Sequence, residues 1–327
     1  MTRSSESGFT LSADLGPAPL AGAVRRLDLA SNLPDGREAF QRMPGGSVPL
    51  FTDGSWVLKF FPPGGERFAH AEWTALQRLH GRVDFEVPEP RERFELEGWS
   101  VVGMSLVGGF PARAVWSHLD QARRLDLSHQ LGRAMQSLHG LCPPRDPVLQ
   151  APGGNFESYL RQRRERFARS PESVGRNVRW IERAGAALES YIDSRPEFGT
   201  EQSALLHTEI MPEHVMIRCE DHRPRLVGLV DFEPSMVGDP LYEFASIGWF
   251  WAEGDPKMLK AVLAGYNEGR ARPLSIRGDD LMAQTLAHRY FHRERWLARL
   301  NPACRKQSLA ELTRYVFGQT GRISEAV

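Results

Sequence analysis

Two stretches decide the fold of this chain: Leu205-Leu206-His207-Thr208-Glu209-Ile210-Met211-Pro212-Glu213-His214-Val215-Met216-Ile217 and Leu226-Val227-Gly228-Leu229-Val230-Asp231-Phe232-Glu233. In each stretch an apolar run of the kind that forms a buried strand leads into an acidic residue, Glu209 in the first and Asp231 in the second. The spacing between the two acids suits one hairpin, so we expect both carboxylates at the same end of one small sheet. An acid that follows a strand can instead cap a turn or a helix, and this interpretation stays open for Asp231 taken alone.

The composition is that of a globular protein with more than one lobe. The chain has 327 residues, which is longer than a chain built around a single hydrophobic core usually is. Its formal net charge is zero, which argues against nucleic acid or an anionic membrane as a partner. We find no segment suited to a signal peptide or a membrane span, and no sign of an obligate protein partner. The three cysteines are scattered and odd in number, so we expect a reducing, cytoplasmic location.

The order of the secondary-structure signals predicts an α+β fold with two lobes. We expect a flexible segment over residues 1–22, a small β-rich N-lobe over 23–105 and a larger, mainly helical C-lobe over 106–327. Asp53-Gly54 between two apolar runs predicts a hairpin in the N-lobe. Pro49 has no N–H to donate to a ladder, which predicts that the first strand of this hairpin lies at the sheet edge.

Helices are predicted on both sides of a hinge. A helix is expected from Glu66 to His80, and Gly108-Gly109 is the expected hinge between the lobes. Apolar residues at helical spacing between Leu127 and Leu138 predict a helix that buries one face. Asp239 is expected to cap a helix that begins at Pro240, because proline favours the first helical position.

An ion pair is predicted between Lys59 and Glu72. Lys59 shares one strand face with Val57 and Phe61, and Glu72 lies on the apolar stripe of the predicted helix. A carboxylate that faces a core needs a cation, because an unpaired buried charge is unfavourable. The alternative is that both side chains reach solvent from the edges of their elements.

The chain resembles the aminoglycoside phosphotransferase and choline kinase family, distant relatives of protein kinases, with features of hygromycin and macrolide phosphotransferases. That family carries His-Gly-Asp-x-x-x-x-Asn, an aspartate about twenty residues further on, and then Gly-Asp-Pro. The matching residues run in the same order over roughly residues 40–250. They are Lys59, Glu72, Val102-Gly103-Met104-Ser105-Leu106, Leu131 to His139, His207-Thr208-Glu209, His214, Asp231-Phe232-Glu233 and Gly238-Asp239-Pro240-Leu241-Tyr242.

The resemblance implies a bilobal, protein-kinase-like fold and a nucleotide site in the N-lobe. ATP or GTP is expected to bind with its inner phosphates on Lys59, which Glu72 would hold in place. The base is expected near Met104 and Leu106. Ser47, which follows the turn Pro44-Gly45-Gly46, is expected near the phosphates, although Pro-Gly-Gly is more often only a turn.

The resemblance also assigns roles to the C-lobe residues. Glu209 and His207 are the expected catalytic residues, with Glu209 orienting the acceptor hydroxyl for attack on the γ-phosphorus. Asp231 is expected to bind Mg²⁺, with His214 assisting it or bonding to a phosphate oxygen.

Three positions depart from the family pattern. Thr208 stands in place of glycine, Glu209 in place of aspartate and His214 in place of asparagine. Glutamate reaches about 1.5 Å further from the backbone than aspartate, so the loop must sit back to keep hydrogen-bond distance. Macrolide phosphotransferases resemble this chain in having histidine at the third position.

The leading hypothesis is a small-molecule kinase that phosphorylates a hydroxyl of an antibiotic. After residue 250 basic residues outnumber acidic residues, which does not suit a strongly cationic acceptor. A less charged pocket could be lined by aromatic residues, which at helical spacing are more often core: Trp249, Trp251, Tyr266, Tyr290, Phe291 and Trp296. Three alternatives stay open: a kinase of a metabolite alcohol, a degenerate kinase-like module that binds nucleotide without turnover, and a zinc site built from His207, Glu209 and His214.

Overall fold

The computed structural model describes residue 23 and residues 40–44, 46–141, 145–169, 178–194, 203–221, 223–288 and 308–323. The chain divides into two compact units. Unit 1 comprises Met1–Arg82, Glu86–Val107 and Asp231–Glu233, and unit 2 comprises Val83–Phe85, Gly108–Val230 and Pro234–Val327. Residues 1–22, predicted to be flexible, lie outside the described part, and the predicted lobe boundary at 105/106 stays a prediction.

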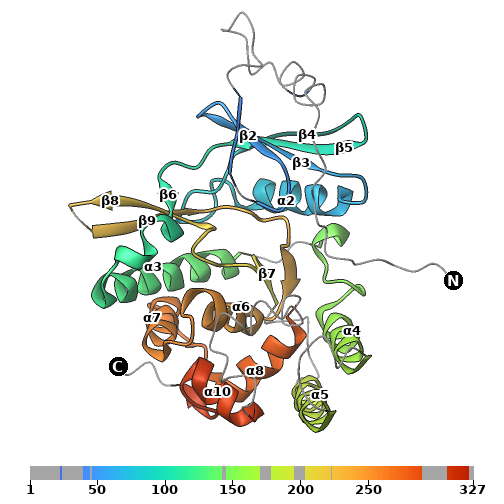
Figure 1. The fold of residues 1–327 in the computed structure, drawn as a ribbon, viewed down its shortest axis with the longest axis vertical. Helices are drawn as coiled ribbons and strands as arrows, with labels where there is room; N and C mark the ends of the chain where they lie inside the picture. The colour runs from blue at the N-terminus through green and yellow to red at the C-terminus, as the bar shows by residue number, and fades with distance from the viewer. Residues whose placement is uncertain are drawn as a thin grey trace, which may run out of the picture. The chain divides into compact units, whose positions relative to one another are not determined.

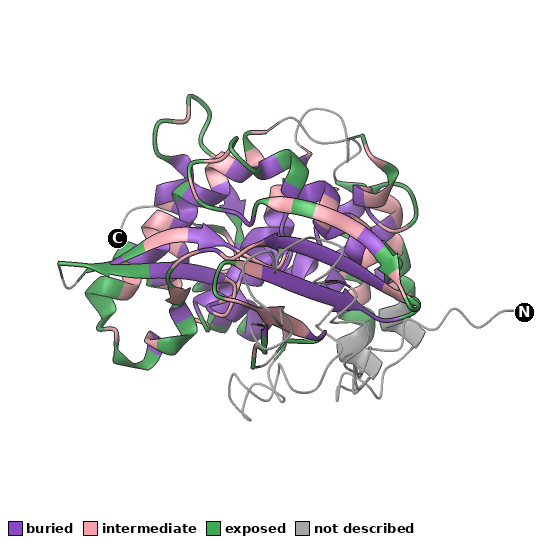
Figure 2. Cartoon of the chain, turned by 90° about the horizontal axis from the view of Figure 1, so that it is seen from above, coloured by how far each residue is buried: buried purple, intermediate pink, exposed green. Residues whose placement is uncertain are grey.

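Unit 1 is built on a five-stranded antiparallel sheet (Figure 1). Its strands, in spatial order, are β1 (Gln41–Arg42), β2 (Leu50–Thr52), β3 (Trp56–Phe61), β5 (Trp99–Ser105) and β4 (Pro90–Leu96). Phe40, Leu58, Phe60, Phe94 and Val101 form a core cluster on one side of the sheet. Burial differs between the strands (Figure 2): five of the six residues of β3 are buried, but only one of the seven residues of β4.

The predicted hairpin is confirmed, but the predicted edge position of its first strand is wrong. Strands β2 and β3 pair with Thr52 opposite Val57, and Asp53 Oδ1 accepts the N–H groups of Ser55 and Trp56. Strand β1 pairs with β2 at Phe51 and Thr52, beyond Pro49, so the missing N–H of the proline does not prevent this pairing.

Helix α2 (Glu66–Leu79) follows β3 and confirms the predicted helix over Glu66–His80. Its buried residues include Glu72, Ala75, Leu76 and Leu79. It packs against β4 and β5 on the sheet. Glu72 therefore points into the interior of unit 1, as its place on the apolar stripe predicted.

Unit 2 is mainly helical. Its helices are α3 (Gln121–His139), α4 (Phe156–Arg169), α5 (Val178–Asp193), α6 (Pro240–Ser246), α7 (Pro256–Asn267), α8 (Gly278–Ala287) and α10 (Leu309–Phe317), with 3₁₀ turns η1 (Ala112–Ala114), η2 (Trp116–His118) and η3 (Pro147–Leu149) and a π-helical turn η5 (Ile247–Trp251). The predicted buried face of α3 is confirmed, because Leu127, Leu131 and Leu138 are fully buried. The predicted cap is also confirmed: Asp239 Oδ1 accepts the N–H of Leu241 at the start of α6.

Within its described residues, unit 2 also contains three small sheets. Strand β8 (Val215–Glu220) lies between β6 (Phe110–Pro111) and β9 (Arg223–Leu229), β7 (Ala204–Leu206) pairs with β10 (Met236–Gly238), and β11 (Ile276–Arg277) pairs with β12 (Arg322–Ile323). The prediction of one sheet for the two opening stretches is therefore wrong. The chain turns at Thr208, which has a φ of 71°, and β7 takes β10 as its partner instead of the β8–β9 hairpin.

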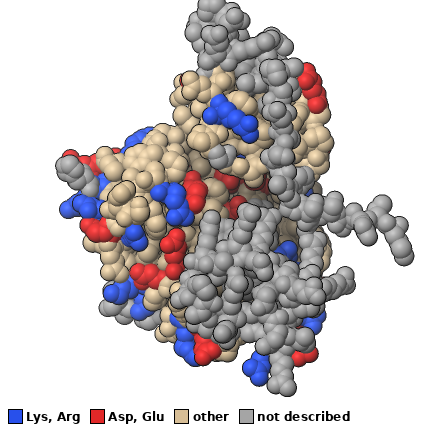
Figure 3. All heavy atoms as spheres, viewed as in Figure 1, with Lys and Arg blue, Asp and Glu red and all other residues tan. Residues whose placement is uncertain are grey.

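The surface carries both signs of charge. On the face shown in Figure 3, basic and acidic side chains are interspersed. This distribution agrees with the zero net charge of the sequence. Among the helices that the structure describes, none combines the length and the apolar character needed to cross a membrane.

Candidate active site

The predicted site residues form two groups, one in each unit, and each group is described by itself. In unit 1, three carboxylates surround one lysine. Lys59 Nζ lies 2.7 Å from Glu72 Oε2, 2.5 Å from Asp231 Oδ1 and 3.1 Å from Glu233 Oε2. We call these four residues the lysine cluster. The ion pair predicted between Lys59 and Glu72 is present, and Glu233, to which the sequence assigned no role, joins it.

Lys59 is held in its charged form in a buried position. The residue is 2% exposed, and its Nζ lies 5.2 Å from the centre of the Phe61 ring on the same strand face. Burial lowers the pKa of Lys59, but attraction to Asp231, Glu233 and Glu72 outweighs burial and raises the pKa well above its usual value. The ammonium group is therefore a fixed positive charge at any pH at which the protein works.

Glu72 differs from the other carboxylates of the cluster because it is almost completely buried. Burial is the largest cause that raises its pKa to about 7, and repulsion from Asp231 and Glu233 adds to it against the attraction of Lys59. One ammonium group thus faces three acids, and the cluster takes up a proton near neutral pH.

The lysine cluster has the ligand chemistry of a site for a hard divalent cation. Carboxylate oxygens of Glu72, Asp231 and Glu233 all lie within 4.8 Å of one another. Such oxygens are the ligands that Mg²⁺ prefers. A divalent cation would also offset the excess of negative charge, so the residues present fit the metal that the resemblance implies. Asp231 itself has a φ of 74°, a conformation that aspartate tolerates better than most residues.

In unit 2, His207 holds the start of the loop that carries Glu209. His207 Nε2 lies 2.9 Å from the carbonyl oxygen of Val230, which can only accept, so we assign the ring proton to Nε2. Nδ1 then accepts the N–H of Glu209 at 3.3 Å. His207 is fully buried, and these two bonds fix the loop against the residue that precedes Asp231 in the chain.

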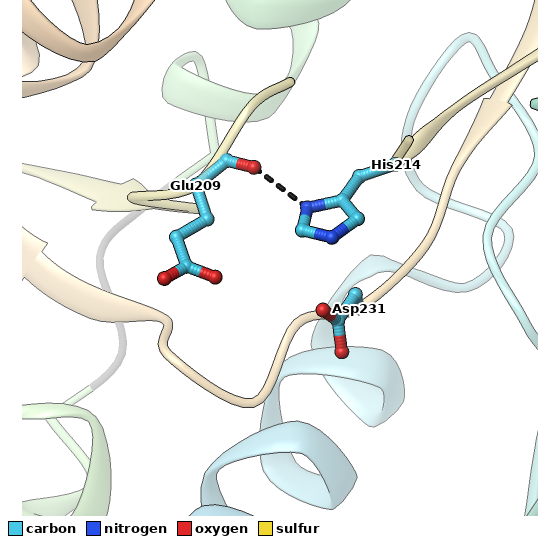
Figure 4. A group of neighbouring side chains, drawn as sticks. All are labelled: Glu209, His214 and Asp231. Atoms are coloured by element: carbon cyan, nitrogen blue, oxygen red, sulfur yellow. Dashed lines mark hydrogen bonds between the residues drawn. The ribbon is translucent and has the colours of Figure 1, made fainter. Parts of the chain in front are cut away.

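His214 closes the other end of this loop (Figure 4). Its Nδ1 donates to the carbonyl oxygen of Glu209 at 2.7 Å, and its own carbonyl accepts the N–H of Val230 at 3.0 Å. With the proton on Nδ1, the lone pair of the ring is on Nε2. A histidine that donates its other ring N–H to a backbone carbonyl is the usual arrangement of a metal ligand. The tautomer therefore suits the assisting role expected for His214.

A buried network that the sequence did not predict lies beneath this loop. Glu243, in the first turn of α6, is fully buried. Its Oε2 lies 2.7 Å from His139 Nε2, and His139 Nδ1 lies 3.1 Å from the hydroxyl oxygen of Tyr266. The signals available in the sequence were an acid inside the apolar run Leu241 to Ile247 and a histidine at the end of a predicted helix; neither identifies its partner.

The other predicted nucleotide-binding residues are separate from the lysine cluster in the contacts described. Met104, in β5, is buried and pairs with Val57 of β3. The N–H of Leu106 donates to the carbonyl of Ser55. Ser47 is exposed. Their role in nucleotide binding stays a prediction.

The aromatic residues considered for an acceptor pocket fall into two groups. Trp249 and Trp251 are buried and donate to Thr285 and Ser128, and Tyr266 is buried against His139, as expected of core residues. Tyr290, Phe291 and Trp296 lie outside the described residues.

Comparison with known proteins decides the family. The model of a family described as "Phosphotransferase enzyme family" matches residues 49–274. The chain belongs to the phosphotransferase enzyme family. This confirms the family and the class of enzyme predicted from the sequence, a small-molecule kinase. No protein of curated function matches the sequence.

Solved structures of aminoglycoside and macrolide phosphotransferases share the fold. The GDP complex of aminoglycoside 2'-phosphotransferase-IIIa is 16% identical, with a TM-score of 0.57 over 91% of this chain and 97% of that one. A macrolide 2'-phosphotransferase from Brachybacterium faecium is 21% identical, with a TM-score of 0.52 over 85% and 98%. An aminoglycoside phosphotransferase from Streptomyces rimosus, in complex with ADP and streptomycin, is 17% identical, with a TM-score of 0.55 over 82% and 98%. The predicted α+β, kinase-like fold is confirmed.

Proposed function

We propose that this phosphotransferase moves the γ-phosphate of ATP or GTP to a hydroxyl group of an antibiotic of the aminoglycoside or macrolide type. The observation that carries the proposal is the lysine cluster, in which a buried glutamate and a strand lysine meet the acid of the Asp231-Phe232-Glu233 segment. A charged, oriented lysine beside a carboxylate-rich metal site is what transfer of a phosphoryl group requires.

The residues of unit 1 bind and neutralise the nucleotide in this proposal. Lys59, oriented by Glu72, pairs with the inner phosphates, and the base lies near Met104 and Leu106. Asp231 would hold Mg²⁺, with His214 assisting it. When bound, the metal neutralises charge on the outer phosphates. Glu233 shares the ammonium group with Asp231, which keeps the lysine charged when a phosphate replaces one of its carboxylate partners.

The loop of unit 2 supplies the acceptor side of the reaction. Glu209 accepts a hydrogen bond from the attacking hydroxyl and orients it, and His207 holds the backbone from which Glu209 projects. Phosphoryl transfer depends chiefly on positioning and charge neutralisation, so a carboxylate that orients the hydroxyl is sufficient.

The acceptor class is supported by what similar proteins bind. Solved structures of the same fold include complexes with streptomycin and with kanamycin. Another structure of this fold is that of a macrolide phosphotransferase. The excess of basic over acidic residues after residue 250 suits acceptors less cationic than most aminoglycosides.

A second candidate is a kinase-like module that binds nucleotide without transferring phosphate. It is favoured by the replacement of the family's aspartate and asparagine by Glu209 and His214 in the same loop. Such a module would bind nucleotide through the lysine cluster and transfer phosphate to no acceptor.

A transfer screen tests the proposal. The protein is incubated with Mg²⁺ and γ-labelled ATP or GTP, and with aminoglycosides, macrolides or small alcohols, and Glu209→Ala is the control. We expect transfer to at least one antibiotic and a loss of about a hundredfold or more in the control. Transfer only to small alcohols would contradict the antibiotic class, and nucleotide binding without any transfer would establish the second candidate.

A further inference from the structure

Thr208 adopts a backbone conformation that its side chain disfavours. Its φ is 71°, in the left-handed region, where a β-branched residue is rare and strained. Glycine adopts this conformation freely. The residue lies between His207 and Glu209, so its conformation sets the direction in which the chain reaches Glu209. A strained residue persists only where its surroundings hold it in place.

Each polar group of Thr208 makes a buried hydrogen bond. Its N–H donates to Glu243 Oε1 at 2.6 Å, and its hydroxyl donates to the carbonyl oxygen of Pro234 at 3.1 Å. Its carbonyl oxygen accepts from His288 Nε2, also at 3.1 Å. The residue is 2% exposed, so no water replaces these partners. The backbone bonds would be available to a glycine, but the bond to Pro234 needs the hydroxyl.

The two side chains that hold the peptide of Thr208 are themselves fixed. Glu243 accepts a second backbone N–H, that of His207, at 3.2 Å, and it also pairs with His139. The ring of His288 is stacked on that of Tyr242 with 4.9 Å between the ring centres. Since both partners are buried and held by other bonds, they form a rigid frame around the peptide.

Pro234 directly follows the segment Asp231-Phe232-Glu233 in the chain. The hydroxyl of Thr208 therefore links the loop that carries Glu209 to the backbone carbonyl of Pro234, the residue that follows the segment carrying Asp231. No other side-chain group of Thr208 could make this link, because the rest of the side chain is a methyl group.

We propose that Thr208 is a positioning residue, which rests on the proposed phosphoryl transfer. Its hydroxyl locks the loop that carries Glu209 to the backbone carbonyl of Pro234, within the frame of Glu243 and His288. The lock places the Glu209 carboxylate without touching nucleotide or acceptor. Loss of the hydroxyl thus reduces kcat and leaves the affinity for nucleotide almost unchanged.

Two substitutions of Thr208 separate the hydroxyl from the shape of the side chain. Thr208→Val keeps the branching and the volume but removes the donor, and Thr208→Ser keeps the donor. The matched control is Thr313→Val, at a buried threonine of α10 whose hydroxyl donates to the carbonyl of Leu309. If Thr208→Val fails to fold, Thr208→Ser is compared with Thr208→Ala, since this pair also differs by the hydroxyl alone.

The variants are compared by hydrogen–deuterium exchange of peptides covering residues 205–217, and by kcat, KM for the nucleotide and the Kd of the Mg²⁺–nucleotide complex. We expect Thr208→Val to speed exchange in these peptides and to reduce kcat at least tenfold, with Kd changed less than threefold. Thr208→Ser and Thr313→Val should retain wild-type exchange there and kcat within about threefold.

Unchanged exchange in Thr208→Val, or equal losses of kcat in the valine and serine variants, would overturn the lock. The exchange measurement also separates this inference from the proposed function. If the wild-type protein transfers phosphate to no acceptor, the proposed function fails, and faster exchange in Thr208→Val but not in Thr208→Ser still establishes the lock. Equal exchange in those two variants refutes it.

Discussion

Glu72 Oε2 lies 2.7 Å from Lys59 Nζ, and both side chains are almost completely buried. The pair joins a helix to the central part of the unit 1 sheet, since Glu72 belongs to α2 and Lys59 to β3. Two further carboxylates, those of Asp231 and Glu233, meet the same ammonium group, so a single positive charge is shared by three acids.

Replacement of Lys59 by methionine should abolish most activity. The substitution keeps much of the side-chain volume and removes the charge that pairs with phosphate. We expect kcat/KM with Mg²⁺–ATP or Mg²⁺–GTP to fall at least about a hundredfold. Three carboxylates would also lose their shared cation, which should lower the free energy of unfolding by about 3 kcal/mol. Lys257→Met, at the start of α7, is the matched control and should retain activity; equal losses in the two variants would refute the role of Lys59.

Replacement of Glu72 by glutamine should change how stability depends on pH. The pKa of Glu72 is about 7, above the value of 4.5 for an ordinary glutamate, so the folded chain binds this proton more tightly than the unfolded chain does. The stabilisation is complete below about pH 4.5 and is lost as the pH rises through 7. Urea unfolding from pH 5 to 8 should show stability falling in the wild type and a shallower fall in Glu72→Gln. Parallel curves would contradict the assignment.

Glu243 should show the opposite dependence. Burial raises its pKa, but the hydrogen bond and charge of His139, with the nearby His207 and the N–H of Thr208, lower the pKa below its usual value. Its contribution to stability is present above about pH 4.5 and is lost as the pH falls further through the lowered pKa. Glu243→Gln should flatten the acid side of the stability curve and lower the free energy of unfolding at pH 7 by about 1–3 kcal/mol.

A surface glutamate provides the control for this measurement. Glu189→Gln removes a carboxylate that pairs with Arg161 and Arg164 and is about one-third exposed, so we expect a change below about 1 kcal/mol. If Glu243→Gln and Glu189→Gln lowered the free energy of unfolding at pH 7 equally, the buried bonds of Glu243 would stabilise the fold no more than a surface ion pair does.

The sequence predicted local features of the fold better than long-range pairing. The hairpin at Asp53-Gly54, the buried face of α3 and the cap at Asp239 each depend on a few neighbouring residues, and all three are present in the structure. The predicted edge position of the strand that follows Pro49 was wrong, because β1 pairs with that strand beyond the proline. Strand β1 has only two residues, both exposed, and so short a segment carries no strand pattern in the sequence. The pairing of β7 with β10 could not be predicted either, because the apolar pattern of a strand does not indicate which distant strand it pairs with.

The same distinction holds for the site. Glu72 was recognised because a carboxylate on an apolar stripe needs a cation, and Lys59 was the nearest one. The frame around Thr208 was not recognised, because Glu243 and His288 contact it from elements far along the chain. The positive φ of Thr208 was not predicted from its residue type, since threonine is an unusual choice there; the available signal was the glycine that the family pattern has at this position.

Glu209→Asp tests whether the longer carboxylate is matched to its loop. The backbone of Glu209 is fixed by His207 at its N–H and by His214 at its carbonyl, so a shorter side chain cannot be compensated by movement of the loop. The carboxylate of aspartate would stop about 1.5 Å short of the hydroxyl, and we expect kcat to fall at least about tenfold while KM for the nucleotide stays within about twofold. Glu213→Asp makes the same change at the next acid of the loop, which pairs with Arg113 at the surface, and should retain the wild-type kcat. A Glu209→Asp variant as fast as the wild type would show that the loop adjusts to either acid, and the fixed placement of Glu209 would be wrong.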